Sequence, residues 1–240
     1  ENKFGVNKNT FYEIINYCKN SKNIDLKCLS VHIGSQILDH RPYEKMLNTL
    51  NSILKKTDHK FEFIDLGGGM GINYSNKNKK LNYNKYNAAI LRFLKNNNVK
   101  IIFEPGRSII GNTGTLITKV IYIKDSERKK FVILDAAMND LMRPALYGAI
   151  HKTLPVIKSK KFSKKPYEFV GPICESTDKF VTLNNFQELK EKDLIAICDV
   201  GAYGISLSSN YNLRLKPIEL LINKSKIKII KKRQKYKDII

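Results

Sequence analysis

The sequence predicts a partial (β/α)8 barrel of the TIM type over residues 1–108, followed by a mainly antiparallel β domain over residues 109–240. Three observations favour this fold class. Helical and short apolar segments alternate up to residue 108, which is typical of a parallel α/β sheet. Each apolar segment ends in glycine or polar residues, as barrel strands do at the face that carries the active site. Beyond residue 109, β-rich runs separated by turns indicate an antiparallel sheet.

The first half is expected to contain three helices and three strands. Apolar residues recur at helical spacing over residues 9–20, 42–56 and 83–95, and Pro42 suits the first turn of its helix. The strands are expected at residues 27–33, 61–66 and 100–103. Three strand–helix units cannot close an eight-stranded barrel. Either this half is a smaller α/β layer or the first barrel strands lie upstream, and we favour the second.

The second half is expected to be built from six β-rich runs. They cover residues 114–123, 130–136, 167–170, 180–182, 194–200 and 218–230. The sequence contains no internal repeats, so a solenoid or a propeller is not indicated.

Composition narrows the classes of function. The net charge is +21, but the excess is lysine spread along the whole chain rather than a basic stripe with interleaved aromatic residues. We therefore expect no nucleic-acid partner. No run of 18 apolar residues exists, so we expect no membrane span. The four cysteines and four histidines show no metal-ligand spacing, which predicts reduced thiols, no metal and a cytoplasmic protein.

Three strand ends of the first half carry residues with chemical potential. They are His32 to Gln36, the glycine run Gly67, Gly68, Gly69, and Glu104 to Arg107. Each has an ordinary interpretation as well: a core histidine, a tight turn, and a salt bridge beside a turn. If the strands are parallel, however, Ser35, the glycine run and Arg107 share one edge, and a phosphate is the simplest ligand for that set.

Three segments of the second half are also candidates. Arg143 and Tyr147 lie four residues apart, and an arginine can grip a carboxylate with two hydrogen bonds. Cys174 and Glu175 follow a Gly-Pro bend and could serve as a proton donor and an ammonium anchor; the alternative is a buried cysteine. Tyr203 lies between small residues and is either presented on a turn or buried as a core aromatic.

The order and spacing of these motifs carry more information than any one of them. HIGSQ, DLGGGMG, EPGR, NDLMRPALYGAIH, VGPICES and DVGAYG occur in that order. They closely resemble the motifs of the diaminopimelate decarboxylases, a branch of the fold-type III pyridoxal-phosphate decarboxylases. NDLMRPALYGA together with CES points to this branch more than to the ornithine decarboxylases.

The resemblance implies roles around the cofactor, pyridoxal 5'-phosphate. His32 would stack against the ring, and Glu104 would bond the pyridine nitrogen and keep it protonated. The phosphate would be held by Ser35, Gly67, Gly68, Gly69, Gly106 and Tyr203, with Arg107 nearby. A carboxylate beside the ring nitrogen favours its charged form, and a charged ring can accept the electrons left when CO2 departs.

The resemblance also implies roles around the substrate. Arg107, Arg143 and Tyr147 would hold the non-reacting carboxylate, with Tyr203 also in contact, and Glu175 would meet the distal ammonium. Cys174 would supply the final proton. Because Cys174 and Glu175 would reach into the partner's site, a homodimer with shared active sites is expected. The implied reaction is decarboxylation of meso-2,6-diaminopimelate to L-lysine and CO2, the last step of lysine biosynthesis.

One departure from the family stands out. The family anchors its cofactor on a lysine in a Tyr-Ala-x-Lys-Ala-Asn-like stretch, and no such stretch occurs among these 240 residues. We therefore expect the chain to be part of a longer protein and to be inactive by itself. Two alternatives stay open: a decarboxylase of another diamino acid (carboxynorspermidine, arginine or ornithine), and a non-catalytic relative that acts as a binding subunit.

Overall fold

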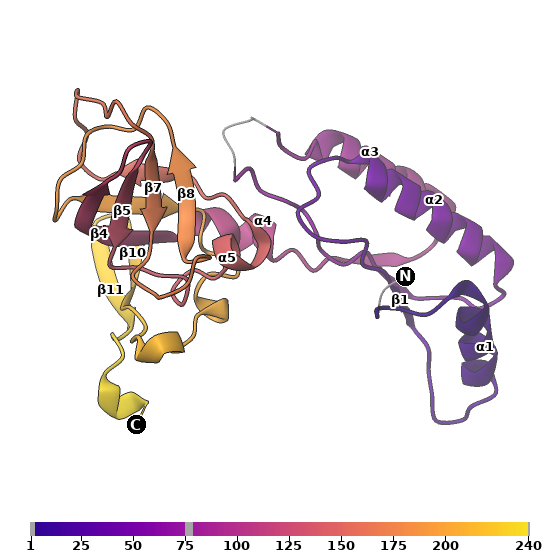
Figure 1. Ribbon diagram of the computed structural model, residues 1–240. Coiled ribbons are helices and arrows are strands. Elements are labelled where there is room, and N and C mark those ends of the chain that lie inside the picture. Colours follow the sequence, from indigo (N-terminus) through magenta and orange to yellow (C-terminus); the bar gives the residue numbers. More distant parts are fainter. Residues whose placement is uncertain (1–2, 75–78, 240) are drawn as a thin grey trace. The chain divides into compact units, whose positions relative to one another are not determined.

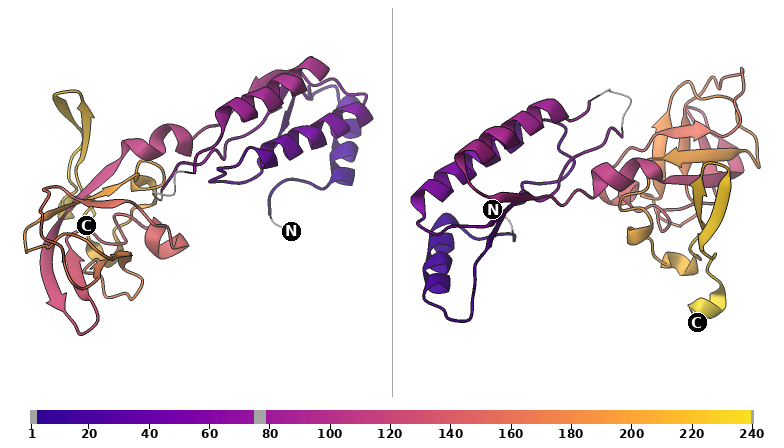
Figure 2. Two further views of the ribbon diagram at one scale, coloured as in Figure 1. Left: turned by 90° about the horizontal axis from the view of Figure 1, so that it is seen from above. Right: turned by 180° about the vertical axis from the view of Figure 1, so that it is seen from behind.

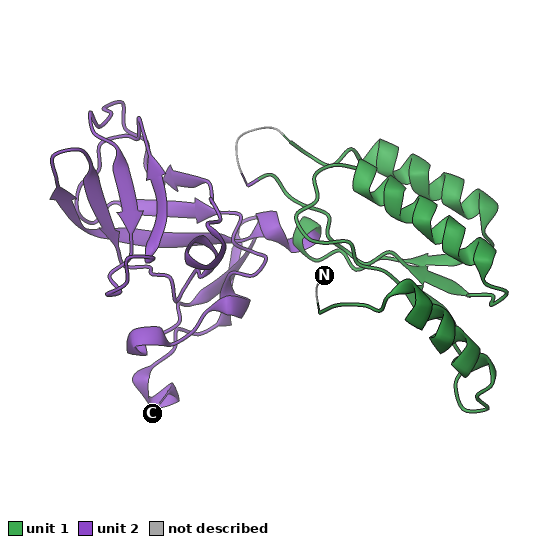
Figure 3. Cartoon of the chain, turned by 45° about the vertical axis from the view of Figure 1, so that its right-hand side comes forward, with its two compact units in different colours: residues 1–73, 79–108 green, residues 74–78, 109–240 purple. Residues whose placement is uncertain are grey.

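The computed structural model describes residues 3–74 and 79–239 (Figure 1). The chain divides into two compact units: residues 1–73 and 79–108 form unit 1, and residues 74–78 and 109–240 form unit 2 (Figure 3). Each unit has a hydrophobic core of its own. Among the residues described, no helix combines the length and the apolar character needed to cross a bilayer.

Unit 1 is a three-stranded parallel sheet with three helices. The helices are α1 (Lys8–Lys19), α2 (Arg41–Lys56) and α3 (Tyr83–Asn96), and the strands are β1 (Cys28–Ser30), β2 (Phe63–Asp65) and β3 (Lys100–Ile102). The strand order is β1-β2-β3, and both neighbouring pairs are parallel. The predicted alternation of helices and strands is confirmed. Three adjacent strands suit either an α/β layer or one sector of a barrel, so barrel closure stays a prediction.

The strands are shorter than expected: β1, β2 and β3 each contain three residues. Separate backbone bonds follow at their ends: Val31 donates to the carbonyl of Asp65 over 2.9 Å, and Leu66 donates to that of Ile102 over 3.0 Å. Backbone hydrogen bonds therefore continue to hold the chain beyond the ends of the strands.

Asparagine side chains cap the N-termini of two helices. Asn7 accepts a hydrogen bond from the amide of Thr10, and Asn82 accepts one from the amide of Lys85.

The core of unit 1 lies between the sheet and the helices. Tyr43 from α2 and Tyr86 from α3 pack with ring centroids 4.7 Å apart, and α2 and α3 run side by side in Figures 1 and 2. Ile64 of β2 and Phe93 of α3 belong to the same core and are almost fully buried. Burying such a side chain contributes roughly 1.5–3 kcal/mol. The buried faces of the helices are therefore apolar, and this spacing of apolar residues predicts the helices from the sequence.

Unit 2 contains a six-stranded sheet and a separate hairpin. The sheet strands are β4 (Thr115–Asp125), β5 (Lys130–Leu134), β6 (Thr153–Pro155), β7 (Tyr167–Val170), β8 (Lys179–Leu183) and β9 (Leu194–Cys198), in the order β6-β9-β4-β5-β7-β8. Every neighbouring pair is antiparallel except β5 with β7. The mainly antiparallel β domain is therefore confirmed, with one parallel pair added.

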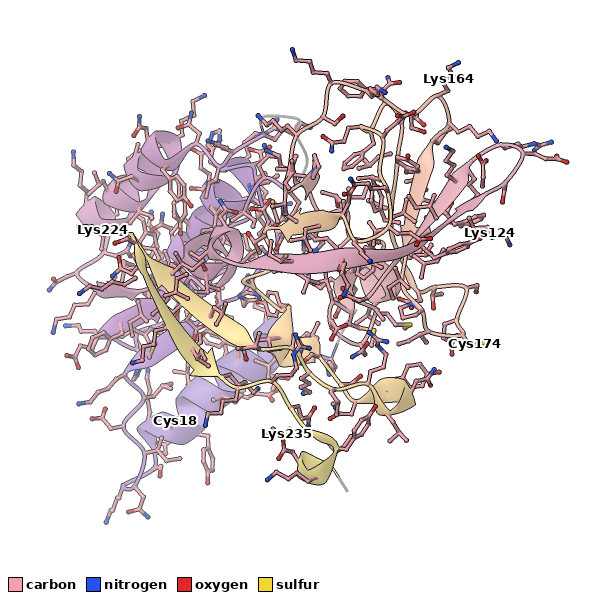
Figure 4. The ribbon with its side chains drawn as sticks, turned by 90° about the vertical axis from the view of Figure 1, so that its left-hand side faces the viewer. Cys18, Lys124, Lys164, Cys174, Lys224 and Lys235 are labelled. Atoms are coloured by element: carbon pink, nitrogen blue, oxygen red, sulfur yellow. The ribbon has the colours of Figure 1, made fainter. Side chains whose placement is uncertain are left out.

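The other helical segments are short. Helix α4 (Arg107–Ile110) spans the boundary between the units in the sequence. Unit 2 contains α5 (Arg143–Tyr147) and the 3-10 turns η1 (Gly111–Thr113), η2 (Ile205–Leu207), η3 (Tyr211–Leu213) and η4 (Tyr236–Asp238). The β-rich run expected at residues 218–230 is confirmed as β structure, and it folds as a hairpin of β10 (Glu219–Asn223) and β11 (Lys226–Lys231). This hairpin extends from the rest of the unit in Figure 2. Lys224, at φ 55°, makes the turn at its tip (Figure 4), and apolar periodicity alone does not reveal it.

Candidate active site

The candidate residues of unit 1 gather where the three strands end. Glu104 donates its backbone amide to the carbonyl of Gly67 over 2.9 Å, and Ile37 donates to that of Gly69 over 2.9 Å. A Cβ on Gly68 would lie 2.2 Å from the carbonyl oxygen of Glu104. The glycine run therefore exists first of all because neighbouring loops approach it too closely for a side chain.

Gly67 makes a tight turn at the edge where the strands end. Its φ is 62°, in the left-handed region, and its amide donates to Asp65 Oδ1 over 2.8 Å. A Cβ there would also meet His32 Nδ1 at 2.9 Å. Gly67 thus makes a turn that leaves no room for a side chain beside His32, which the pairing of β1 with β2 brings to this edge.

Ser35 and Arg107 supply polar groups at the same edge. Arg107 donates from Nη2 to Ser35 Oγ over 3.2 Å. A Cβ placed on Gly106 would meet no atom within 4 Å, so space is open beside this pair. A guanidinium, a hydroxyl and an open glycine suit an anion such as a phosphate, and the residues present fit the phosphate group of pyridoxal phosphate.

His32 and Glu104 are both exposed in this unit. The ordinary interpretation of His32 as a core histidine is therefore wrong. Glu104 also lies at the surface of this unit, so burial of its carboxylate requires a ligand or further chain to cover it.

In unit 2, Arg143 and Tyr147 occupy the two ends of α5 but have different surroundings. Arg143 is 6% exposed, whereas Tyr147 is 67% exposed. The Arg143 guanidinium donates from Nη1 to His151 Nε2 over 2.8 Å and lies 4.4 Å from the centroid of the Tyr74 ring. The arginine is therefore enclosed by its neighbours, whereas most of the Tyr147 side chain faces solvent.

Cys174 and Glu175 lie on the loop that follows β7, and Cys174 is exposed (Figure 4). The alternative of a buried structural cysteine is therefore wrong. Glu175 accepts a 2.5 Å hydrogen bond from the hydroxyl of Tyr211, and this carboxylate raises the pKa of Tyr211. Sequence reasoning missed Tyr211, because nothing in its local pattern relates it to a loop 36 residues away.

Tyr203 follows β9 on a turn with unusual backbone geometry. Its φ is 58°, which is uncommon for a residue with a side chain, and it is 45% exposed. The core-aromatic alternative is wrong. Gly201 makes the turn possible, because a Cβ there would lie 1.9 Å from the carbonyl oxygen of Ile110. Such strained, exposed positions are often functional sites.

A buried polar network connects the loops of unit 2. Asp178 accepts from the amide of Met138 over 2.7 Å and from that of Ile173 over 2.8 Å, and so ties the segment before Arg143 to the segment before Cys174. Arg214 donates from Nε to Asn139 Oδ1 over 3.0 Å. Burial raises the pKa of Asp178, and the two amide donors oppose that shift.

Comparison with known proteins identifies the class to which this fold and these residues belong. Residues 14–201 match the family model described as pyridoxal-dependent decarboxylase, C-terminal sheet domain. The chain belongs to the pyridoxal-dependent decarboxylase family. The resemblance drawn from the motifs is therefore confirmed.

The curated relatives indicate one branch of this family, the diaminopimelate decarboxylases. The chain is 40% identical over 242 residues to a diaminopimelate decarboxylase of Helicobacter pylori, and 37% identical over 243 residues to that of Aquifex aeolicus (strain VF5). These alignments cover 100% of this chain but 60% and 58% of the relatives. The chain thus spans about 60% of the length of the curated relatives it matches. The crystal structure of the H. pylori enzyme complexed with L-lysine superposes with a TM-score of 0.93 at 40% identity, over 100% of this chain and 60% of that one.

Proposed function

We propose that the protein to which this chain belongs decarboxylates meso-2,6-diaminopimelate to L-lysine and CO2 with pyridoxal phosphate as cofactor. The observation that carries the proposal is the edge of unit 1 where Ser35, Arg107 and the glycine run meet, on a chain that aligns over its full length with diaminopimelate decarboxylases. A solved relative complexed with L-lysine supports the same substrate class.

The proposed roles in unit 1 concern the cofactor. Ser35, Arg107 and the backbone at Gly68, Gly69 and Gly106 would hold its phosphate, while Gly67 shapes the turn. His32 would cover one ring face, and Glu104 would hold a proton at the pyridine nitrogen by opposite-charge pairing. When bound, the cofactor supplies the electron sink for the charge left by loss of CO2.

The proposed roles in unit 2 concern the substrate. Arg143 and Tyr147, with Arg107 from unit 1, would hold the non-reacting carboxylate, and Tyr203 would contact both substrate and cofactor phosphate. Glu175 would pair with the distal ammonium. The exposed Cys174 thiol would deliver a proton to the Cα atom that has lost CO2.

The same proposal extends to assembly. Residues 1–108 would form the C-terminal part of a (β/α)8 barrel and residues 109–240 the β domain. The remaining barrel strands and the cofactor lysine would belong to the part of the longer relatives that this chain does not cover. The exposed Cys174–Glu175 loop suits a homodimer with shared sites, and the four free cysteines suit a reducing cytoplasm.

The function is tested by measuring CO2 release and L-lysine formation from meso-diaminopimelate by the full-length protein with pyridoxal phosphate. Carboxynorspermidine, ornithine and arginine serve as competing substrates. Turnover of diaminopimelate alone is expected. Preference for another substrate would support the alternative decarboxylase, and no turnover of any of them would support a non-catalytic binding subunit.

Two further experiments test the missing lysine and the shared site. The 240-residue chain with pyridoxal phosphate and borohydride should give no stoichiometric adduct; one trapped on a single lysine would place the anchor within this chain. In the full-length protein, Cys174→Ala and Glu104→Ala should each lower turnover strongly. Random mixing of the two should restore about one quarter of wild-type activity, because half the dimers carry one intact site of two. No recovery would exclude a shared site.

A further inference from the structure

His151 lies against the Arg143 guanidinium in unit 2. It is 3% exposed. Its Nε2 faces Arg143 Nη1 at 2.8 Å, and its Nδ1 faces the carbonyl oxygen of Cys198 at 3.0 Å. Both ring nitrogens of a deeply buried imidazole are therefore engaged at once.

The two contacts allow only one protonation state. A carbonyl oxygen can only accept, so Nδ1 must carry the proton. A guanidinium can only donate, so Nε2 must be the bare acceptor. A charged imidazolium would set an N–H group against the N–H of Arg143. The geometry therefore requires neutral His151 with its proton on Nδ1.

The local fold explains how His151 reaches the arginine. α5 ends at Gly148, whose φ of 60° turns the chain back. The chain then enters β6, which pairs with β9, and Cys198 donates its amide to the carbonyl of Lys152 over 2.8 Å. His151 thus connects a five-residue helix to the rigid sheet.

Tyr74 completes the contact. Its ring centroid lies 4.4 Å from the guanidinium carbon of Arg143 and 5.2 Å from the ring centroid of His151, at 74° to that ring. A guanidinium over an aromatic face is stabilised by a cation–π interaction. With an acceptor on one edge and a ring on one face, the arginine has a single well-defined orientation.

We propose that His151 is a positioning residue for substrate recognition: by accepting from Arg143, it aims the guanidinium at the substrate's non-reacting carboxylate. The inference rests on the proposed function. A planar fork binds a carboxylate well only when its orientation is fixed in advance. Without the imidazole acceptor, the guanidinium loses one of the contacts that fix its orientation, and each substrate molecule must restore that order as it binds.

Two amide variants separate this role from simple packing. His151→Gln places a carbonyl oxygen near the position of Nε2, whereas His151→Asn is shorter and withdraws that acceptor from Arg143 Nη1. Two ligands separate the carboxylate from the rest of the substrate: L-lysine retains it, and 1,5-diaminopentane lacks it. His59→Gln is the control, because His59 also contacts a backbone carbonyl, that of Leu26, but lies in unit 1.

Calorimetry on the full-length, cofactor-loaded protein gives the binding constants. His151→Asn is expected to weaken L-lysine binding about tenfold and to raise KM for diaminopimelate similarly, which is the effect of losing one hydrogen bond to a charged group. Its kcat and its affinity for 1,5-diaminopentane should change less than about threefold, and His151→Gln should resemble wild type. Equal losses for both amide variants, or for both ligands, would overturn the proposal.

Nitrogen NMR of the histidine rings supplies a readout that needs no activity. The resonance that disappears in His151→Gln should report a neutral ring protonated at Nδ1 at neutral pH. A ring protonated at Nε2, or on both nitrogens, would overturn the proposal. Wild-type protein that releases no CO2 would instead refute the proposed function, and the NMR result would still decide the role of His151 towards Arg143.

Discussion

Asp178 provides the sharpest test of how the loops of unit 2 are held. It is 3% exposed, and its two carboxylate oxygens accept from the amides of Met138 and Ile173. A Cβ on Gly171 would lie 2.2 Å from Asp178 Oδ2, so the neighbouring chain is closed tightly around this carboxylate. The side chain therefore acts as a bridge between the loop before α5 and the loop that carries Cys174.

The magnitude follows from the two amide groups. Asp178→Ala removes both acceptors, and each buried N–H left unsatisfied costs about 1–3 kcal/mol. Ile173 is buried and Met138 is only partly buried, so water can compensate one site in part. We expect a loss of about 2–4 kcal/mol in the free energy of unfolding. Asp178→Asn keeps one acceptor and should lose about half as much.

Urea unfolding followed by circular dichroism measures this loss, because the chain has no tryptophan for fluorescence. Gly171→Ala should lose a comparable amount by displacing the same carboxylate. Asp193→Ala is the control: its carboxylate accepts one amide, that of Lys190, in an exposed turn, and it should change stability by less than about 1 kcal/mol. If Asp178→Ala unfolded at the same urea concentration as the control, with an unchanged dependence of the unfolding free energy on urea concentration, Asp178 would not act as a bridge between the two loops.

Three other perturbations follow from the same geometry. Gly68→Ala places a Cβ 2.2 Å from a backbone carbonyl oxygen. This variant should lower the unfolding free energy by about 2–4 kcal/mol and weaken cofactor binding. Gly106→Ala is the control, because a Cβ at Gly106 meets no atom within 4 Å, and it should keep the wild-type melting temperature. Burial tends to raise the pKa of Glu168, but pairing with two lysines lowers it overall. Ionised Glu168 therefore stabilises the fold at pH values above the pKa of the unfolded chain, and this stabilisation is lost as the pH falls through the lower pKa of the folded protein. Glu168→Gln should therefore cost about 1 kcal/mol at neutral pH and nothing in acid, by urea titration at each pH. Tyr211→Phe removes the hydroxyl that donates to Glu175. The KM for diaminopimelate should rise several-fold, which is about the effect of one hydrogen bond to a charged group, while the melting temperature stays unchanged. An unchanged KM would contradict the proposal that Glu175 binds the distal ammonium of the substrate.

The fold of unit 1 was largely predictable because its signals are local. The apolar faces of α2 and α3 repeat with helical spacing, and the strands end where glycine or polar residues begin. Parallel strands bring their ends to one edge, so the meeting of Ser35 with Arg107 could be expected from the strand order alone. The glycines at that edge could be predicted, but not that neighbouring backbone lies too close to Gly68 and Gly69 for a side chain.

Unit 2 was predictable in class but not in detail. The antiparallel character follows from frequent turns, yet the turn at Lys224 has no glycine, proline or asparagine at its centre to announce it. The buried Arg143 contacts His151, which lies just before the β6 segment that pairs with β9, and Tyr74, which comes from a distant part of the chain. Contacts of this kind are set by tertiary structure, and no periodicity in the sequence encodes them.

The division between the units has a consequence for how substrate choice is encoded. In the proposed scheme, unit 1 holds the cofactor through backbone approaches so close that almost no side chain fits at its glycine run. Unit 2 would supply most of the substrate contacts through side chains on loops, and those loops are tied to one another by buried Asp178 and by Arg214. Exchanging Glu175 or its partner Tyr211 leaves that framework intact, because neither side chain belongs to it. A change of substrate is therefore physically accessible through unit 2 alone, whereas a change at the glycine run would disturb every loop that meets there.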